Sequence, residues 1–534
     1  MNTPLNYDVI VVGTGPTGLV LAHLLGNFGL HTLVIDKNDG PADEARAVTI
    51  DDESLRTLQA TGMLPEVLPN VVQGYGVHYY SWTNQLFAKI EPSSREYGYP
   101  KRNAFRQQLL VQALSQGMTR QASVSLRYGH ELTSLEQHAD HVTASVQHLG
   151  PTQPQNQTFT ARWLVACDGG RSTVRELLGI ALEGSTYKEK WLIADLIGRT
   201  SPFRHTRTYC DPQRPAIRLP GPQSTVRYEF MLHPGEDPET VLEDTQLRQW
   251  IHGRDPQDAQ LSLLRKVVYT FHARVATRWR QGRVLLAGDA AHLTPPFAGQ
   301  GMNSGVRDAV NLAWKLAANL KQGASPQLLD SYQQERKPHA WALIQMALRI
   351  GAFMQPKSRL GAALAQTLLK LVCLVPAARD YILHLKFKPK PRFHAGFFAP
   401  WPVAEAKISS GQLMTQPLVE LPNGQTTLLD DLLGTGFAVL QWADSPELAL
   451  PTGMQAQVLH IIRHADDFLP TTTAAHPQCV RDVQHELANV LDSAQAQAVV
   501  LRPDRYVLAY VGQDASKACG TIAQVFHTHY PTPP

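Results

Sequence analysis

The hydrophobic pattern of the first forty residues predicts a complete strand–helix–strand unit. Residues 8–12 form a short β-branched run, which is typical of a buried parallel strand. Residues 19–28 are apolar along one helical face and stop at Gly29, and a second apolar run over 31–35 ends at Asp36. Because strand and helix alternate, the pattern predicts an α/β fold that begins with a parallel sheet.

The turn between the first strand and its helix has the composition of a phosphate-binding turn. It reads Gly13-Thr14-Gly15-Pro16-Thr17-Gly18. In such turns the first glycine permits the tight turn, the second lets a pyrophosphate approach the backbone, and the third lets the helix pack on the sheet. The helix N-terminus offers free N–H groups to phosphate. Glycine-rich turns are also common structural features, but here the required strands and helix surround the motif, which favours a dinucleotide site.

Asp36 ends the second strand, where a carboxylate accepts hydrogen bonds from ribose hydroxyls, and Lys37 follows it. Its negative charge disfavours a 2′-phosphate at this position. Asp36 by itself does not distinguish FAD from NAD. No second GxGxxG motif occurs in the chain, so a nicotinamide cofactor is not expected to have a Rossmann domain of its own.

Two later strands also end in turns suited to a nucleotide. Residues 163–170 end in an Asp168-Gly169 turn, which is equally compatible with a surface turn capped by Ser172. Residues 283–292 contain a strand that ends at Gly288-Asp289. The loop that follows is rich in Gly and Pro and precedes a helical segment over 306–320. Such a loop can lie flat against a ligand, and the helix N-terminus can stabilise negative charge.

In order and separation, these motifs resemble the signature set of the class A flavoprotein monooxygenases, the family of para-hydroxybenzoate hydroxylase and phenol hydroxylase. The resemblance implies bound FAD, a transient visit by NADH or NADPH, and hydroxylation by O2 through a flavin hydroperoxide. Asp168 would contact FAD indirectly and help to admit the nicotinamide. The FAD contacts that the resemblance implies are Gly13, Gly15, Pro16, Thr17, Gly18, Asp36, Lys37, Arg46, Gln107, Asp168, Gly288, Asp289, Pro296, Gly299, Gly301, Met302 and Asn303.

Further segments narrow the resemblance to the 3-(3-hydroxyphenyl)propionate hydroxylases, which act on phenols with an acidic side chain. The resemblance extends over about residues 5–395, although Asp36 replaces the more usual Glu. It implies ortho hydroxylation of a 3-(3-hydroxyphenyl)propionate or 3-hydroxycinnamate type of substrate to a catechol, in aromatic compound catabolism. The segments that carry it are residues 46–59, 101–105, 163–170, 308–316 and 331–336.

Three other functions fit the same motifs. The chain could tailor a larger polyketide-like aromatic as a monooxygenase. It could be a flavin-dependent reductase or dehydrogenase without oxygen insertion. It could also be a flavin-binding structural or sensory protein, although a substrate-sized insert within the FAD framework disfavours this reading.

The alternating pattern of residues 183–275 predicts antiparallel strands, and the resemblance implies that part of 70–100 joins them. The predicted fold is therefore a Rossmann-like FAD-binding domain with an inserted mixed or antiparallel substrate sheet, the para-hydroxybenzoate hydroxylase fold. The FAD-binding domain would comprise 1–182 and 276–395. Residues 411–534 resemble a thioredoxin-like domain without a CxxC motif, which favours a packing or dimer-contact role and makes a homodimer possible.

A sheet that covers the flavin would create an apolar, water-poor pocket at a domain interface. Arginines could bind a substrate carboxylate there, although alternation also predicts that one face of such a sheet is solvated. His292 is expected to be a buried structural histidine rather than a base. The candidate catalytic residues are Tyr209, Arg218, Arg227 and Tyr228, with His205 and Arg207 as further candidates for substrate contact.

Composition excludes several other classes of protein. With 43% apolar and 18% charged residues, a net charge of +3 and no basic run, neither disorder nor nucleic-acid binding is expected. Five cysteines without a CxxC pair argue against a disulfide framework and a zinc ribbon, so no metal is expected. No signal peptide is recognisable, which together with reduced thiols indicates a cytoplasmic protein. The apolar segment 360–375 favours a buried helix over a membrane-surface helix, and no membrane partner is expected.

Overall fold

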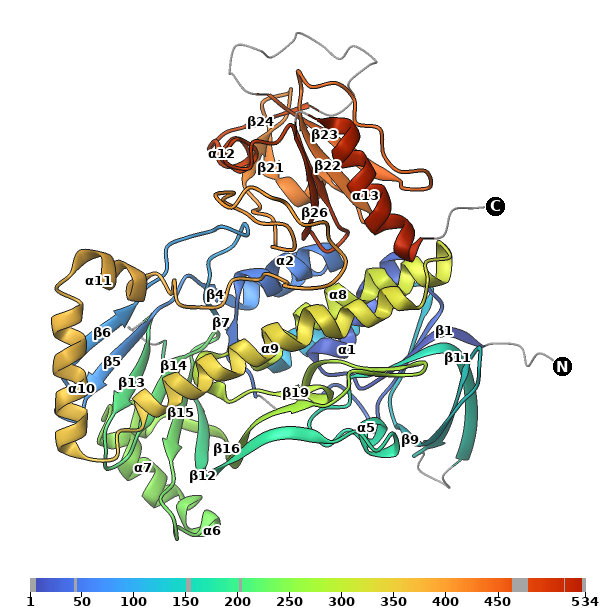
Figure 1. Ribbon diagram of the computed structural model, residues 1–534. Helices are drawn as coiled ribbons and strands as arrows, with labels where there is room; N and C mark the ends of the chain where they lie inside the picture. The colour runs from blue at the N-terminus through green and yellow to red at the C-terminus, as the bar shows by residue number, and fades with distance from the viewer. Residues whose placement is uncertain are drawn as a thin grey trace.

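Three large β-sheets and two long helices organise the chain (Figure 1). The structure, a computed structural model, describes residues 6–42, 46–149, 155–200, 204–462, 479–512 and 514–530. Helices α8 (Gly301–Lys321) and α9 (Gln327–Met354) cross the middle of the molecule in Figure 1, with the C-terminal sheet above them. The long helices therefore connect regions that are distant in sequence.

The first sheet contains the parallel strands that the N-terminal pattern predicts, in the order β17-β18-β11-β1-β2-β8, and only β17 in this order is antiparallel to its neighbour. β1 pairs in parallel with both β2 and β11, and its apolar residues are buried because both faces of the sheet are covered. Helices α1 (Pro16–Asn27) and α8 contribute to the same core. The strands are β1 (Tyr7–Val12), β2 (Thr32–Ile35), β8 (Val124–Arg127), β11 (Gln155–Ala166), β17 (Arg280–Gln281) and β18 (Val284–Leu286), with β9 (His130–Gln137) and β10 (Val142–His148) antiparallel beside β11.

The second sheet is antiparallel except where β13 pairs in parallel with β5, and its order is β19-β16-β12-β15-β14-β13-β5-β6. One of its faces packs against α7 (Asp244–His252). The other face is turned toward the first sheet and α9. The strands are β5 (Val77–Ser81), β6 (Leu86–Ile90), β12 (Leu182–Ile197), β13 (Thr206–Cys210), β14 (Ala216–Pro220), β15 (Thr225–Met231), β16 (Ser262–Ala276) and β19 (His292–Leu293).

The C-terminal sheet has the order β21-β20-β24-β23-β22-β25-β26. β22 pairs in parallel with β23 and antiparallel with β25, so the sheet is mixed. The elements are β20 (Leu418–Glu420), β21 (Thr426–Leu428), β22 (Phe437–Trp442), β23 (Ala456–Ile462), β24 (Cys479–Asp482), β25 (Ala498–Leu501), β26 (Val507–Val511), α12 (Glu486–Ser493) and α13 (Ala515–His529).

Shorter strands and helices connect the three large sheets. A small sheet of β3 (Thr49–Ile50), β7 (Asn103–Phe105) and β4 (Val71–Gln73) borders the first two sheets. The remaining α-helices are α2 (Asp52–Thr61), α3 (Leu64–Val67), α4 (Gln107–Gly117), α5 (Thr173–Leu177), α6 (Pro238–Val241), α10 (Arg359–Val372) and α11 (Pro376–Leu383).

The prediction that the apolar segment 360–375 is a buried helix is wrong. The segment does form α10, but only Ala362 and Gln366 of that helix are buried, and all of its leucines except Leu369 are exposed. The leucines recur at helical spacing, which is typical of a face that packs on the protein, so the pattern by itself favoured burial. Among the described residues, no single helix is long and apolar enough to cross a membrane; α10 and α11 together, bent by 112°, meet that test by length and composition.

A buried ionic network joins the C-terminal domain to the two long helices. Arg502 donates to both carboxylate oxygens of Glu335 on α9, at 2.7 and 2.9 Å, and also bonds Asp504. Lys315 of α8 donates to the same Glu335 at 2.7 Å. Burial alone would raise the pKa of Glu335, but Arg502 and Lys315 lower it to about 2. The contact between domains therefore depends on charges that must be present together.

We predict that Arg502→Met lowers the free energy of unfolding by about 3–5 kcal/mol, because it leaves two buried carboxylates without their main cation. Urea unfolding followed by tryptophan fluorescence measures this change. The control is Arg120→Met, which removes the exposed ion pair with Glu66 and should change the free energy of unfolding far less, because solvent screens that pair. Equal losses in the two variants would show that the Arg502 network is not a stabilising contact.

Candidate functional site

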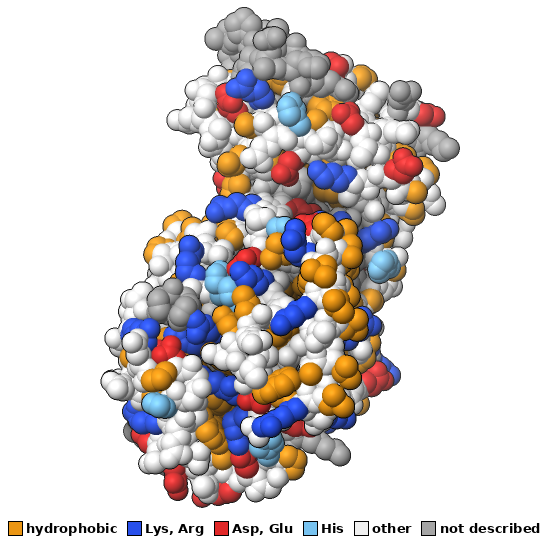
Figure 2. All heavy atoms as spheres, turned by 90° about the vertical axis from the view of Figure 1, so that its left-hand side faces the viewer, with side chains coloured by type: hydrophobic (Ala, Val, Ile, Leu, Met, Phe, Trp, Pro, Cys, Tyr) orange, Lys and Arg blue, Asp and Glu red, His pale blue; other side chains and the backbone are white. Residues whose placement is uncertain are grey.

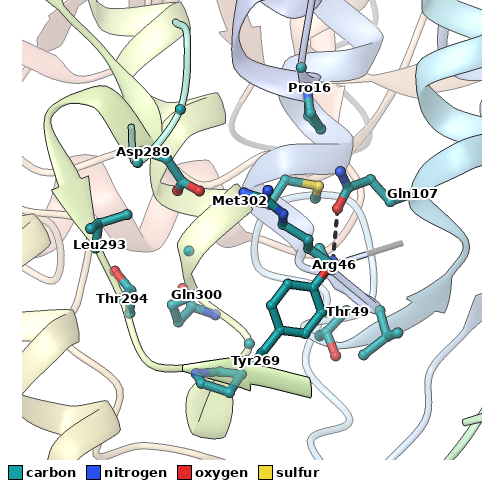
Figure 3. Close-up of a pocket in the computed structure, with 18 of the residues that line it drawn as sticks. Pro16, Arg46, Thr49, Gln107, Tyr269, Asp289, Leu293, Thr294, Gln300 and Met302 are labelled. Atoms are coloured by element: carbon teal, nitrogen blue, oxygen red, sulfur yellow. Dashed lines mark hydrogen bonds between the residues drawn. The ribbon is translucent and has the colours of Figure 1, made fainter. Parts of the chain in front are cut away.

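A cavity of about 1160 Å³ extends between the first and second sheets. The glycine turn after β1, the Asp168 turn after β11 and the loop before α8 line one part of it, and strands of the second sheet line the other part. Figure 3 shows Pro16, Asp289 and Met302 around the same space, with Tyr269 on the side of the second sheet. Three segments that are distant in sequence therefore enclose one site.

The glycine turn has room for a ligand but little room for side chains. Gly13 has φ +106°, and a Cβ there would lie 2.4 Å from the carbonyl oxygen of Cys167. A Cβ at Gly18 would lie 2.0 Å from the oxygen of Gly13, whereas Gly15 faces open space. Gly13, Gly15, Pro16 and Thr17 line the cavity, and Gly18 instead provides the close packing of α1.

Asp36 fixes this turn to the end of β2. Its Oδ2 accepts hydrogen bonds from the backbone N–H of Thr14 at 2.7 Å and from the Thr14 hydroxyl at 2.8 Å. Its Oδ1 accepts from the backbone of Asn38 at 2.9 Å. Asp36 and Lys37 both line the cavity, as do Arg46 and Gln107. Gln107 is oriented by the backbone N–H of Ala47, which donates to it at 2.8 Å.

Two further carboxylates line the cavity at the ends of parallel strands. Burial raises the pKa of Asp289, and burial likewise raises the pKa of Asp168. Asp168 Oδ2 accepts from the backbone of Val174 at 3.1 Å, whereas Oδ1 is buried without a hydrogen-bond partner among the described residues. Both carboxyls border the cavity, which makes this part of its lining polar.

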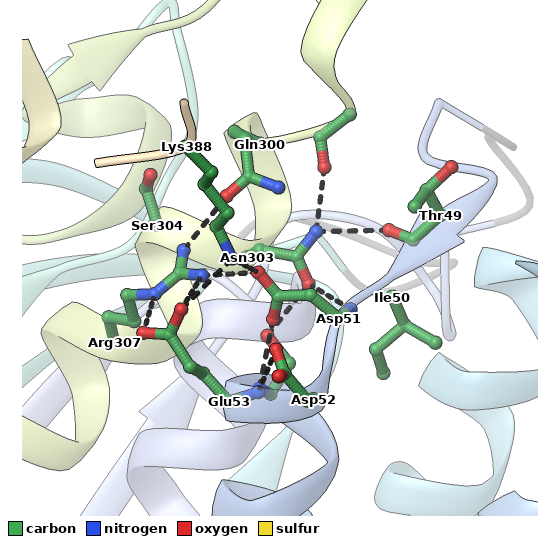
Figure 4. Close-up of polar contacts among 12 residues, drawn as sticks. Thr49, Ile50, Asp51, Asp52, Glu53, Gln300, Asn303, Ser304, Arg307 and Lys388 are labelled. Carbon is green, nitrogen blue, oxygen red and sulfur yellow. Dashed lines mark hydrogen bonds and ion pairs between the residues drawn. The ribbon is translucent and has the colours of Figure 1, made fainter. Parts of the chain in front are cut away.

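The loop before α8 is held from beneath by Asn303 (Figure 4). Its amide donates to the carbonyls of Thr49 and Gly299, at 3.1 and 2.7 Å. Its oxygen accepts from the backbone of Asp51 and the hydroxyl of Ser54. Pro296, Gly299, Gly301 and Met302 line the cavity, whereas Asn303 is buried behind them.

The same helix binds the acidic start of α2. Arg307 donates to both oxygens of Glu53, at 2.6 and 2.9 Å, and also bonds Asp51. Lys388 lies 3.0 Å from oxygens of Asp51 and Glu53. Although burial opposes ionisation, Arg307 and Lys388 hold the pKa of both carboxyls below their usual values. Sequence reasoning did not identify this cluster, because Arg307 and Lys388 lie more than 250 residues after Asp51 and Glu53.

Gly288 does not line the cavity but sets the turn that presents Asp289. Its N–H donates to Asp308 Oδ2 at 3.0 Å, and His292 Nε2 lies 2.7 Å from the same oxygen. Arg336 donates to the other oxygen of Asp308 at 2.9 Å. His292 is completely buried in this network and is absent from the cavity lining, as expected of a structural histidine.

The part of the cavity beside the second sheet is mostly apolar. Its charged lining includes Glu229 on β15 and Arg102 before β7, and Thr206, Thr208, Tyr269, Thr270 and His272 also contribute polar groups. Burial raises the pKa of Glu229 to about 7, although Arg227 opposes this shift. The Arg102 guanidinium lies 4.9 Å from the ring centre of Tyr75, and its Nε is buried without a hydrogen-bond partner among the described residues. The apolar wall includes Val77, Tyr79, Ile193, Ile217, Leu219, Phe271, Ile350 and Phe387.

Three of the predicted catalytic residues lie on the opposite face of the second sheet. Arg218 Nε and the Tyr228 hydroxyl both donate to Asp258 Oδ2, at 2.7 and 2.8 Å, in a buried network. Tyr209 packs in the same cluster as Tyr228. Because successive side chains of a strand point to opposite faces, Glu229 faces the cavity and Tyr228 does not.

The other candidates also differ from expectation. Arg227 shares the Glu229 face but is paired with Asp195 at 2.7 Å and does not line the cavity. Arg207 lies 5.7 Å from the ring centre of Tyr80, and His205 stacks on His78, so neither lines the cavity. The sequence interpretation favoured arginines and tyrosines, and alternation along β15 could not have identified Glu229, because six of the seven residues of this strand are buried.

Comparison with known proteins agrees with this geometry. Residues 6–347 match the family model described as FAD binding domain, and residues 411–525 match the HcaD C-terminal domain. The chain is 37% identical over 531 residues to a 3-(3-hydroxy-phenyl)propionate/3-hydroxycinnamic acid hydroxylase of Escherichia coli strain K12, covering 97% of this chain and 95% of that protein. A second Escherichia coli relative, from strain E24377A, has the same identity and coverage.

Solved structures share the fold. The flavin-dependent monooxygenase PieE, in complex with FAD and substrate, superposes with a TM-score of 0.82 at 22% identity and covers 98% of this chain and 100% of that one. The p-nitrophenol 4-monooxygenase PnpA from Pseudomonas putida DLL-E4 has a TM-score of 0.66 at 26% identity, covering 72% and 98%. A glycine turn, two helix N-termini and buried carboxylates around one elongated cavity fit FAD. The chain belongs to the class A flavoprotein monooxygenases and is an FAD-dependent aromatic hydroxylase.

Proposed function

We propose that this enzyme hydroxylates a small phenol with an acidic side chain, of the 3-(3-hydroxyphenyl)propionate or 3-hydroxycinnamate type, to a catechol with NAD(P)H and O2. The observation that carries the proposal is 37% identity along 97% of the chain to hydroxylases named for these substrates. The cavity supports it, because an apolar wall with one arginine and one carboxyl suits an aromatic ring with two polar ends.

The part of the cavity at the first sheet would hold FAD. Gly13, Gly15, Pro16 and Thr17 with the N-terminus of α1 would receive the pyrophosphate, and Asp36 with Lys37 the adenosine ribose. Gly18, Gly288 and Asn303 would act indirectly, by packing or by positioning these segments. The bound cofactor supplies the redox chemistry: it accepts electrons from NAD(P)H and activates O2. The remaining proposed contacts are Arg46, Gln107, Asp168, Asp289, Pro296, Gly299, Gly301 and Met302.

The part at the second sheet would hold the phenol. We assign Arg102 to the substrate carboxylate, because Arg102 lines this part of the cavity and a guanidinium binds carboxylate in a bidentate manner. We assign Glu229 to the phenolic hydroxyl. An ionised Glu229 would accept the phenol proton and make the ring a better nucleophile toward activated oxygen. The apolar wall would exclude water from the reacting ring.

Substrate-stimulated turnover tests the function. The purified FAD-loaded enzyme should oxidise NADH or NADPH faster when 3-(3-hydroxyphenyl)propionate is added, and isotopically labelled O2 should enter a catechol product. Stimulation only by polycyclic phenols would instead favour the tailoring of larger aromatics. Oxidation of NAD(P)H without labelled product would indicate a reductase.

We predict that Glu229→Gln lowers kcat about 10²- to 10⁴-fold, the usual contribution of a positioned base. In the native enzyme, kcat/KM should rise as the pH increases through about 7, because Glu229 loses its proton there. The variant should lose this rise while keeping its FAD absorbance. Glu243→Gln, at the exposed start of α7, is the matched control. An unchanged pH profile in Glu229→Gln would assign the base elsewhere.

We predict that Arg102→Met raises KM for 3-(3-hydroxyphenyl)propionate about tenfold to a hundredfold, the usual range for a lost charge-assisted hydrogen bond. The same variant should process 3-propylphenol, which lacks the carboxylate, as the native enzyme does. Steady-state kinetics with both substrates measures the difference. Arg95→Met, which changes an exposed arginine, controls for overall charge. Equal losses with both substrates would contradict carboxylate recognition by Arg102.

A further inference from the structure

Helix α10 presents a continuous row of apolar side chains to the outside of the molecule. Six of them are between 56% and 76% exposed, which is unusual for such large hydrophobic groups. The four within α10 recur at helical spacing and therefore share one side, and the other two follow in the bend before α11. The six are Leu360, Leu364, Leu368, Leu371, Leu374 and Val375. Figure 2 shows hydrophobic side chains gathered on this side of the molecule.

The opposite side of α10 lies on the second sheet. Ala362 and Gln366 are buried there, and the Gln366 amide lies 3.4 Å from the carbonyl oxygen of Cys210. Leu369 packs partly into the core cluster beneath. The helix is therefore seated on the protein, and its apolar row is a formed surface.

Charges around this row are almost all positive. From 355 to 392 the sole acidic residue is Asp380, which is bonded to Lys386 and lies 3.2 Å from His384. Basic side chains are interspersed with hydrophobic ones on this side (Figure 2). The exposed basic residues of the segment are Lys357, Arg359, Lys370, Arg379, Lys386, Lys390 and Arg392.

This charge distribution decides between the possible occupants. A second copy of the chain would place the same basic rim against itself, since a twofold interface pairs identical surfaces. An anionic lipid surface accepts both the apolar row and the cations around it. The 14 residues of α10 span about 21 Å, less than the roughly 30 Å of a bilayer core, and α11 turns away by 112°. The geometry suits a helix that lies in the interface.

We propose that α10 and the start of α11 dock the enzyme reversibly on an anionic lipid surface. This departs from the expectation of no membrane partner. The two helices connect segments that line the cavity: Ile350 and Met354 on one side, Leu385 and Phe387 on the other. Docking would therefore bring the apolar part of the cavity close to the lipid, where phenols partition; this consequence alone rests on the proposed function.

Sedimentation with vesicles tests the proposal and requires no catalysis. The full-length FAD-loaded enzyme should bind vesicles of equal parts phosphatidylcholine and phosphatidylglycerol. Its affinity for pure phosphatidylcholine vesicles should be lower by about tenfold or more. Raising the salt concentration should release it. Leu364→Ser/Leu368→Ser should weaken binding about tenfold or more. Lys370→Glu/Arg379→Glu should do the same for anionic vesicles.

The matched control is Leu177→Ser/Leu264→Ser, which changes two other exposed leucines and should bind like the native enzyme. Absence of binding to anionic vesicles, or equal losses in the control, would overturn the proposal. Analytical ultracentrifugation distinguishes lipid docking from contact between two copies of the chain. If the native enzyme is a dimer and Leu364→Ser/Leu368→Ser is a monomer, the row is a contact between copies and the lipid proposal fails. Substrate-stimulated NAD(P)H oxidation in solution tests the proposed function separately.

Discussion

The structure depends on buried ion pairs that helix α8 makes with segments far from it in sequence. Arg307 binds the carboxylates of Asp51 and Glu53, and Asp308 binds the Gly288 turn together with Arg336. The N-terminus of the same helix faces the cavity. Removing one partner of such a pair leaves an uncompensated charge in a low dielectric, which is far costlier than losing a surface pair. The cofactor loops are therefore fixed before any ligand arrives.

Rigidity of this kind has a chemical purpose. A hydroxylase must keep water away from activated oxygen while holding a ring in place beside it. The apolar wall of the second sheet supplies the exclusion, and the buried network beneath Asn303 keeps the loop before α8 against the opposite side. Charges are placed behind the loop, where they fix the backbone, and few are placed in the part of the cavity proposed for the ring.

The sequence was sufficient to predict the turns that line the cavity at the first sheet, because the constraints on these turns are local. Gly13 and Gly18 have no space for a Cβ, and Asp36 binds a turn only 22 residues away. The second sheet is different, because both of its faces are covered by protein. Arg218 and Tyr228 are as buried as Glu229, so no alternation of polar and apolar residues marks the face toward the cavity. Which face is directed toward the cavity depends on the elements that cover the sheet: α7 packs on one face, and the first sheet lies on the side of the other.

Helix α10 also shows that the sequence pattern does not determine which face of an element is buried. Its leucines recur at helical spacing and form one apolar face, and such a face usually packs on the protein, so periodicity favoured burial for 360–375. The structure leaves most of these leucines outside, because the contact with the sheet beneath is made on the opposite side by Ala362, Gln366 and Leu369. In both regions the pattern along the chain identifies the element correctly, and tertiary packing alone assigns its faces. The role of a residue such as Glu229 depends on which face of the sheet carries its side chain. Such a role can therefore be argued only from the three-dimensional structure.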